Sequence, residues 1–354
     1  MELITVDFII VGQGLAGSTL AYFLVKQEKS VLIIDKNPLT SCSKIAAGII
    51  HPVTGRRIVK TWKADELILF AKQFYSEAEK ETGEKLFYDF PVVEIFSSVK
   101  NRNDWLSRSA EQGYENYFGD AVDSGILKKY FHSESGGIEI KHSGFLDAGK
   151  YIAVMRNFLQ TKCMIATEEF SHDDIKIEDS KVLWKNYEAE KIIFCEGNAA
   201  VNNPYIKNIP FLPAKGEILK IYSEELPEDK IFNQRMFIMP AGNHEFKVGS
   251  TYEWNFTDDK PTEKGRTIIE SFLTNFMKVK YKIISHDAAI RPAVQDRRPI
   301  IGLHPSNTTV GIFNGLGTKG VMLAPFFANQ FAKFLNHNSE IEAEVDIKRF
   351  KERI

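Results

Sequence analysis

The chain has 354 residues, enough for two domains or for one domain with a large insertion. Hydrophobic residues make up 44% of it and charged residues 26%, a composition typical of a soluble globular protein. The formal net charge of −2 gives no basic surplus, which argues against a nucleic-acid binder that works by overall charge but leaves a local basic patch open.

The cysteines and the apolar runs bear on the cellular compartment. Cys42, Cys163 and Cys195 lie far apart and form no CxxC pair, so we expect neither a disulfide framework nor a zinc site. No apolar run approaches the roughly 18 residues that a membrane span needs. The first apolar segment has no basic leader and no small-residue cleavage site, so we expect no signal peptide. These features predict a cytoplasmic protein with no metal site and no membrane segment.

The N-terminal part of the chain predicts a β-α-β unit. Residues 7–11 are apolar after Asp7 and are followed by glycine, as in a buried strand. Apolar residues at helical spacing predict a helix over 16–26, and residues 30–34 predict a second buried strand. This order is typical of a parallel sheet. A further helix is expected over 64–82, which contains no Gly or Pro.

The rest of the chain alternates between two patterns. Between about 85 and 150, short strand-like pieces rich in aromatic residues predict the start of a second layer that faces a substrate. Alternating segments from 213 to 291 predict an antiparallel sheet. The remaining segments return to the first layer: a helix over 150–160, a strand over 164–167, a strand followed by glycine over 191–200, and a strand, glycine-rich turn and long helix over 310–335.

The segment GQGLAG joins the first predicted strand to the first predicted helix. Gly12 permits a tight turn, Gly14 lacks the Cβ that would block a pyrophosphate, and Gly17 lets the helix pack closely on the sheet. The helix that begins near Leu15 directs free N–H groups toward the phosphates. Asp35, after the second strand, suits the two hydroxyls of a ribose and argues against NADP. We therefore predict a dinucleotide site, with a plain tight turn as the alternative.

This motif does not separate NAD from FAD, but three later segments bear on the choice. The small residues of SCSKIAAGIIHP (41–52) would let a backbone approach a flat ring, and Gly197 would allow a second close contact with the nucleotide. NGLGTKG (314–320) opens the last helix, whose N-terminus would stabilise negative charge on a reduced flavin. Each segment alone is also explained as an ordinary loop or helix start. Together and in this order they favour FAD.

In these motifs the sequence resembles the FAD-dependent amine and D-amino-acid oxidase family, which includes glycine oxidase and sarcosine oxidase. The resemblance covers essentially the whole chain. It is carried by GQGLAG with Asp35, AAGIIHP, the CEG turn, PAKGEI, IRPAVQDRRPIIG and FNGLGTKGVMLAP. Within the family the likeness is greatest to the FAD oxidase domain of a bifunctional tRNA enzyme that completes methylaminomethyl groups on wobble uridine. That domain has a similar glycine-rich turn and a segment similar to VGSTYEW, whereas its partner methyltransferase domain is absent from this sequence.

The resemblance implies an α/β protein with a Rossmann-like FAD-binding domain and an antiparallel-sheet substrate domain. The expected FAD-binding domain comprises 1–84, 145–212 and 292–354, and the substrate domain comprises 85–144 and 213–291. The FAD is expected to be noncovalent, because the surroundings of His51 do not match the relatives that attach FAD through histidine. The expected cofactor contacts are Gly12, Gly14, Leu15, Ala16, Gly17, Asp35, Lys36, Ser43, Ala46, Ala47, Gly48, Phe170, Gly197, Gly315, Gly317, Thr318, Lys319 and Gly320.

The resemblance also assigns three catalytic candidates. Arg291 matches the position that clamps a substrate carboxylate, which its planar, charged fork suits. The alternative is a structural ion pair with Asp287 or Asp296. Lys319 would pair with the flavin pyrimidine ring or favour oxygen reduction, or else be a solvated lysine. Tyr252 would line the substrate cavity, or else be half-buried core.

Two departures from the family pattern concern the partners. CEGNAA places Glu196 beside the nucleotide, where relatives have an uncharged turn. TGRRIVKTWK (54–63) combines basic residues with one tryptophan. The segment is explained as a solvated helix start, and the alternative is a patch for an anionic partner such as tRNA, which we do not favour.

We predict an FAD-dependent enzyme that oxidises an amine next to a carboxylate, such as an N-substituted glycine or a D-amino acid. In the family, hydride passes from the α-carbon to flavin N5, and dioxygen or another acceptor reoxidises the flavin. The first alternative is removal of a carboxymethyl group from a modified wobble uridine in tRNA. A non-catalytic flavin-binding protein is the second, and an NAD dehydrogenase the third. The particular amine, the electron acceptor and the oligomeric state are left open.

Overall fold

The N-terminal segment folds as the predicted β-α-β unit. In the computed structural model, which describes residues 2–55, 57–178 and 180–354, β1 (Ile4–Val11) is followed by α1 (Leu15–Lys26) and β2 (Val31–Ile34). The two strands pair in parallel. The other edge of β1 pairs in parallel with β14 (Tyr187–Phe194), which pairs in parallel with β21 (Asn307–Asn314).

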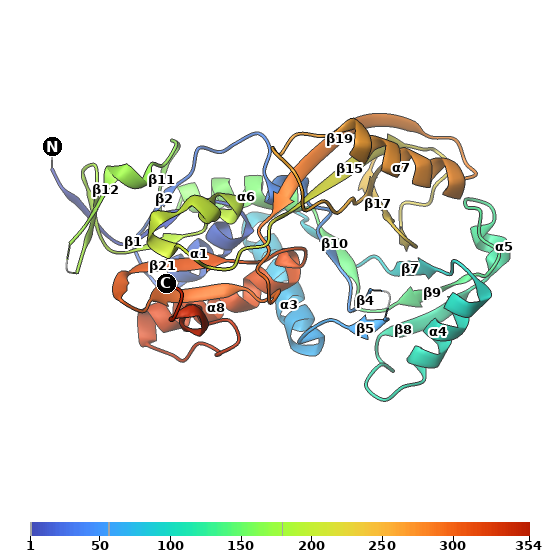
Figure 1. Cartoon of the computed structure of the whole chain (residues 1–354), viewed down its shortest axis with the longest axis horizontal. Helices are drawn as coiled ribbons and strands as arrows, with labels where there is room; N and C mark the ends of the chain where they lie inside the picture. Colours follow the sequence, from blue (N-terminus) through green and yellow to red (C-terminus); the bar gives the residue numbers. More distant parts are fainter. Residues whose placement is uncertain (1, 56, 179) are drawn as a thin grey trace.

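These four strands form the centre of the first large sheet, on the left in Figure 1. Helices α1, α3 (Ala64–Thr82), α6 (Ala148–Gln160) and α8 (Gly320–His337) pack together on one face of it. The predicted helices over 16–26, 64–82 and 150–160 are thereby confirmed. The remaining strands of the sheet are β11 (Met164–Ala166), β12 (Ile175–Ile177), β13 (Val182–Trp184) and β20 (Ile300–His304).

The second large sheet has eight strands in the order β19-β15-β18-β17-β16-β7-β9-β8. It is antiparallel, as predicted, except where β7 and β16 pair in parallel, because β16 joins the edge of a strand from a much earlier segment. The predicted domain boundaries stay a prediction. The strands are β7 (Val92–Ile95), β8 (Phe118–Val122), β9 (Gly137–Ile140), β15 (Ala214–Tyr222), β16 (Ile231–Asn233), β17 (Phe237–Gly242), β18 (Glu245–Gly249) and β19 (Lys282–Arg291).

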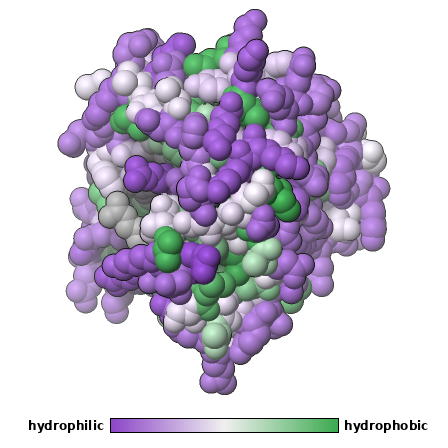
Figure 2. Space-filling view, turned by 90° about the vertical axis from the view of Figure 1, so that its right-hand side faces the viewer, coloured by the Kyte–Doolittle hydropathy of each residue, from purple (hydrophilic) through white to green (hydrophobic). Residues whose placement is uncertain are grey.

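The two faces of this sheet have different neighbours. Its outer face packs against α7 (Glu263–Phe276) and buries side chains such as Phe246 and Leu219. Its inner face turns toward the first sheet, and Met239 shares one hydrophobic core with Phe313 of β21. Figure 2 shows the end of the molecule that carries α4 and α5, where hydrophobic residues gather in separate patches among hydrophilic ones.

Two helices lie where the sequence predicts only strands. In α4 (Val99–Ser109) Trp105 is the one buried residue among those described, so the helix has little apolar periodicity to recognise. In α7 the buried Ile269, Leu273 and Phe276 do have helical spacing, and Thr262 caps the N-terminus, so this signal was present in the sequence.

The remaining elements of the described chain are short. No helix in the described ranges is both long and apolar enough to cross a membrane, and the three cysteines are free. The short elements are α2 (Cys42–Ile45), β3 (Ile49–Ile50), β4 (Val53–Thr54), β5 (Val59–Lys60), β6 (Phe87–Tyr88), α5 (Ser124–Leu127), β10 (Gly144–Leu146) and the 3-10 turns His172–Asp174, Gly197–Asn202, Pro204–Ile206 and Ile347–Phe350.

Replacing Gly17 by alanine is expected to cost about 3 kcal/mol or more of unfolding free energy, because a Cβ there would lie 1.9 Å from the Gly12 carbonyl oxygen. Gly83→Ala is the matched control, since Gly83 has a φ of +71° but no heavy atom within 4 Å of the added Cβ. It should cost only about 1–2 kcal/mol. Urea unfolding of both variants measures the difference, and equal losses would contradict the clash at Gly17.

Candidate active site

Four predicted cofactor segments meet at one edge of the first sheet. Because β1, β2, β14 and β21 are parallel, their carboxyl ends lie side by side. The residues that follow these ends include Gly12, Asp35, Gly197 and Gly315. Asn314 ties two of the ends together by donating a hydrogen bond to the Gly197 carbonyl (2.9 Å). The carboxyl edge of a parallel sheet is where such folds bind their ligands.

The glycines of the opening motif allow close backbone packing as well as close approach of a ligand. Gly12 has a φ of +95°, and a Cβ there would lie 2.6 Å from the Cys195 carbonyl oxygen. A Cβ on Gly14 would instead meet the Ser43 hydroxyl at 2.9 Å, and that hydroxyl accepts a hydrogen bond from the Leu15 amide (3.0 Å). Gly14 has no side chain to cap α1. The N-terminus of α1 and Ser43 therefore form a cradle that fits a phosphate group.

Asp35 is held by the motif that precedes it. One carboxylate oxygen accepts a hydrogen bond from the Gln13 amide (2.8 Å) and the other from the Asn37 amide (2.7 Å). Each oxygen keeps a lone pair for a ribose hydroxyl. Arg156 of α6 lies behind this carboxylate, 3.6 Å away, and donates to the Gln13 side chain. Arg156 was not predicted, because nothing in a helical pattern marks it as a contact of Asp35.

The loop that would approach the flavin ring is fastened to the second sheet. Gly48 has a φ of +74°, and a Cβ there would lie 2.0 Å from the Leu146 carbonyl oxygen. Lys247 of β18 donates to the Ala46 carbonyl (3.3 Å), and burial lowers the pKa of this lysine. Nε2 of the His51 ring forms a hydrogen bond with the Glu94 carboxylate (2.7 Å). Lys247 and Glu94 were not predicted.

Several other predicted cofactor contacts have partners of their own. Lys36 pairs with Glu169 (2.7 Å) at the surface. Phe170 packs on Phe194, with ring centroids 6.1 Å apart. In the glycine-rich turn before α8, Gly317 donates to the Pro292 carbonyl (3.1 Å), Thr318 is exposed, and Gly320 begins the helix. Leu15 and Ala16 lie in the first turn of α1, and Ala47 lies in the loop after α2. All these roles stay predictions.

Glu196, which departs from the family pattern, also has protein partners. One of its carboxylate oxygens lies 2.9 Å from His172 Nε2, and the other accepts from Asn203 (2.6 Å). The carboxylate thus braces the turn after β14.

Arg291, at the end of β19, lies across the backbone of β15. A Cβ on Gly216 would lie only 1.9 Å from its Nη2 atom. Nη2 donates to the Ser250 hydroxyl (2.7 Å) and the Thr251 carbonyl (3.3 Å). Nη1 is buried and has no hydrogen-bond partner among the described residues. Burial lowers the pKa of Arg291, so a carboxylate ligand would restore charge balance.

The expected alternative for Arg291, an ion pair, is wrong for the described part of the chain. Asp287 accepts a hydrogen bond from Ser285 (2.9 Å), and Asp296 pairs with Arg349 (2.9 Å). An arginine fork without a carboxylate partner is therefore left beside the predicted flavin loop and turn.

Tyr252 and Lys319 lie near the other predicted site residues. Tyr252 is 45% exposed, and its ring lies 5.0 Å from the Arg291 guanidinium carbon. Lys319, at the N-cap position of α8, is half-buried and donates to the Thr61 hydroxyl (2.8 Å). Burial, aided by nearby arginines, lowers the pKa of Lys319 from 10.5 to about 8.

Two lysines of the basic segment 54–63 pair with acidic side chains, whereas Arg57 of the same segment is exposed. Lys60 pairs with Asp65 (2.5 Å), and Lys63 pairs with Glu342 (2.6 Å). Arg56 lies outside the described residues. The two lysines are therefore not free to form an anionic-partner patch.

One cavity of about 410 Å³ lies on the outer side of the second sheet. Its lining includes Asp120, Asp123 and Tyr130 but none of the predicted site residues. In the described ranges no group of three or more His, Cys, Asp or Glu side chains is arranged to hold a metal. The site at the carboxyl edge of the first sheet therefore stays a prediction.

Comparison with known proteins identifies the family. The model of the FAD dependent oxidoreductase family (DAO) matches residues 7–334, so the chain belongs to this family. It is an FAD-dependent enzyme with the Rossmann-like FAD-binding fold.

The relatives are distant. The chain is 22% identical to a glycine oxidase of Bacillus subtilis (strain 168), with 90% of both chains covered. It is 24% identical to the tRNA 5-methylaminomethyl-2-thiouridine biosynthesis bifunctional protein MnmC of Leptospira borgpetersenii serovar Hardjo-bovis (strain JB197), with 83% of this chain but only 47% of that protein covered. The iminodiacetate oxidase of Chelativorans sp. BNC1 shares its fold, with a TM-score of 0.80, 20% identity and coverage of 96% and 98%.

Replacing Lys319 by methionine is expected to raise the unfolding free energy at pH 7. The folded-state pKa of about 8 lies below the ordinary value of 10.5, so the folded protein loses this proton first. The destabilisation, at most roughly 3 kcal/mol, is fully present below pH 8 and disappears as the pH rises toward 10.5. Urea unfolding from pH 7 to 10 should show the difference between variant and wild type narrowing.

Lys333, an exposed lysine of the same helix, provides the control. The difference between Lys333→Met and wild type should stay constant over the same pH range. A constant difference for Lys319→Met as well would contradict the burial argument.

Proposed function

We propose that the protein oxidises an amine that carries a carboxylate on the neighbouring carbon, such as an N-substituted glycine or a D-amino acid, with noncovalently bound FAD. The observation that carries the proposal is the buried, unpartnered Nη1 of Arg291. Its guanidinium offers a second donor edge that no described side chain uses, and a carboxylate fits such a fork.

The surroundings of Arg291 support a place next to the cofactor. The residue after it, Pro292, accepts a hydrogen bond from Gly317 in the glycine-rich turn before α8 (3.1 Å). Burial lowers the pKa of the Arg291 guanidinium, and Cys42 of α2, in the loop expected at the flavin ring, is near enough that its thiol partly offsets this by raising the pKa. The arginine thus lies between two segments that we assign to FAD.

Bound FAD would supply the acceptor for the hydride that leaves the substrate carbon. The protein's own contribution is orientation: Arg291 holds the carboxylate, Ser250 and Thr251 fix the guanidinium, and Tyr252 covers it. The Lys319 ammonium, whose pKa is lowered to about 8, would place a positive charge near the flavin that decreases in the alkaline range.

Two other functions remain as competing hypotheses. Removal of a carboxymethyl group from a modified uridine in tRNA would use the same arginine, but Lys60 and Lys63 of the basic segment pair with acidic residues, which weakens the case for an RNA surface there. A non-catalytic flavin protein would bind FAD without turnover. An anaerobic screen of amines and modified tRNA that records the flavin absorbance separates the three, because bleaching by free amino acids supports only the first.

Replacing Arg291 by methionine is expected to raise KM for carboxylate-bearing amines about 100-fold or more, because two charge-assisted hydrogen bonds are lost. The FAD content should be unchanged, since Arg291 belongs to the second sheet. Steady-state kinetics and the flavin absorbance measure the two effects. Arg353→Met, at an exposed arginine near the C-terminus, is the control, and an unchanged KM in Arg291→Met would overturn the substrate-site assignment.

A further inference from the structure

Two exposed aromatic side chains lie beside Arg291 on the segment that follows β18. The ring centroids of Tyr252 and Trp254 are 4.7 Å apart, and the Tyr252 ring lies 5.0 Å from the guanidinium carbon of Arg291. Trp254 is 55% exposed. An isolated exposed ring needs no explanation, but two adjoining rings next to an arginine whose Nη1 atom has no partner among the described residues form a surface that fits a ligand.

The strand geometry directs both rings to the face that carries the guanidinium. The segment continues the pairing of β18 with β15, because Glu253 and Lys215 exchange two backbone hydrogen bonds (2.8 and 2.9 Å). Side chains alternate between the two faces along such a strand. Lys215 and Glu253 belong to the outer face, so Tyr252 and Trp254 belong to the inner face, with Arg291.

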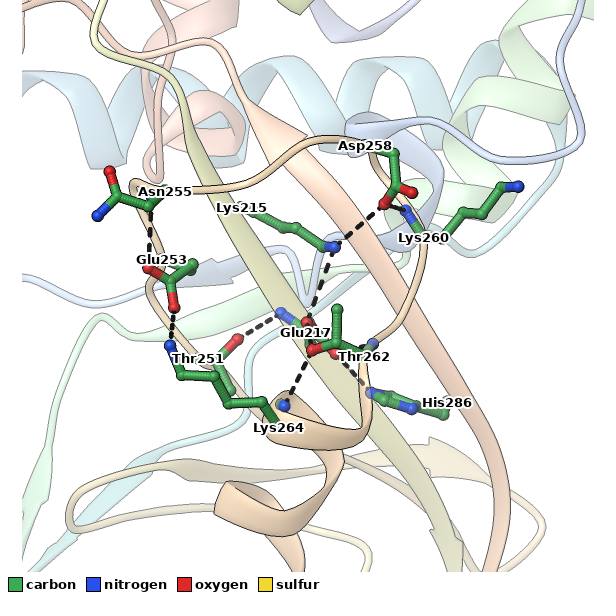
Figure 3. A network of polar contacts seen from close by, with 11 residues as sticks. Lys215, Glu217, Thr251, Glu253, Asn255, Asp258, Lys260, Thr262, Lys264 and His286 are labelled. Carbon is green, nitrogen blue, oxygen red and sulfur yellow. Dashed lines mark hydrogen bonds and ion pairs between the residues drawn. The ribbon is translucent and has the colours of Figure 1, made fainter.

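The loop that carries the rings is anchored at both ends on one buried residue. Figure 3 shows Glu217 between the two ends. Its amide donates to the Thr251 hydroxyl (2.9 Å), and its carboxylate accepts from the amide and hydroxyl of Thr262 (2.9 and 2.8 Å). Lys215 adds a contact to Asp258 in the middle of the loop (3.5 Å). These anchors hold the aromatic pair at a set place relative to Arg291.

We propose that Tyr252 and Trp254 form a stacking site for a planar ring of the substrate, and that Trp254 determines specificity. This inference rests on the proposed amine oxidation: Arg291 holds the carboxylate, and the ring is carried by a substituent of the same small molecule. The substrate class is thus an amino acid whose amine substituent is aromatic or heterocyclic, rather than glycine itself. Stacking on a flat side chain accepts either kind of ring.

The test compares N-benzylglycine with sarcosine (N-methylglycine) as substrates of the FAD-loaded enzyme. Wild type should have the higher kcat/KM for N-benzylglycine. Trp254→Ala should raise KM for N-benzylglycine about tenfold, which corresponds to about 1.4 kcal/mol of stacking, and raise KM for sarcosine by a smaller factor. Trp254→Phe should restore most of the loss, because the ring is kept. Ile268→Ala, at an exposed apolar residue of α7, should leave KM for both substrates unchanged.

Equal loss on both substrates in Trp254→Ala, or no loss on either, would overturn the proposal. A nucleoside whose uracil carries a carboxymethylaminomethyl group, used as a third substrate, distinguishes the source of the ring. Preference for the nucleoside indicates a nucleic-acid base, and preference for N-benzylglycine indicates a small aromatic amine. If neither ring-bearing substrate is preferred over sarcosine, the stacking site is wrong.

A binding measurement separates this inference from the proposed function. Phenylacetate and acetate carry a carboxylate but no amine, so their dissociation constants, read from the flavin spectrum, do not depend on turnover. Tighter binding of phenylacetate, reduced in Trp254→Ala, supports the stacking site even if no amine is oxidised. Equal affinity for the two acids overturns it even if sarcosine is a good substrate.

Discussion

The candidate substrate site depends on the guanidinium group of Arg291 lying flat across β15. This is feasible only because position 216 has no side chain, since a Cβ would lie 1.9 Å from the guanidinium. The group reaches from β19 over β15 to Ser250 and Thr251, so one side chain spans three neighbouring segments of the sheet. A long, flexible cation is thereby held in one orientation, which is what recognition of a carboxylate requires.

The inner face of β15 lies against the candidate binding residue, and its outer face carries the residues that support the neighbouring loop. Gly216 lies on the inner face beneath Arg291, whereas Lys215 and Glu217 are buried on the outer face. Removing charges from water is costly, and these groups are held by Thr262 and by His286, which lies 2.8 Å from Glu217. The buried charges therefore anchor the loop that carries Tyr252, on the face of the sheet that packs against α7.

Much of the nucleotide-binding half could be predicted from the sequence because its signals are local. The strand, the glycine turn and the helix around Gly12 are consecutive in the chain, and their order matches the observed β1 and α1. Helix α4 could not be predicted in this way, because Trp105 is the one described residue that it buries. Arg156 and Lys247 were missed because their partners, Gln13 and the Ala46 carbonyl, are far away in the sequence.

By itself, the sequence determined the class of cofactor, the parallel strands that are expected to bind it and the candidate arginine, because these depend on short motifs with backbone requirements of their own. Only the tertiary structure decided how Arg291 is partnered, that Lys319 is half-buried, and that Tyr252 and Trp254 are exposed beside the arginine. Burial and pairing arise where distant segments meet. A local pattern specifies which residues are present but not which of them remain without a partner.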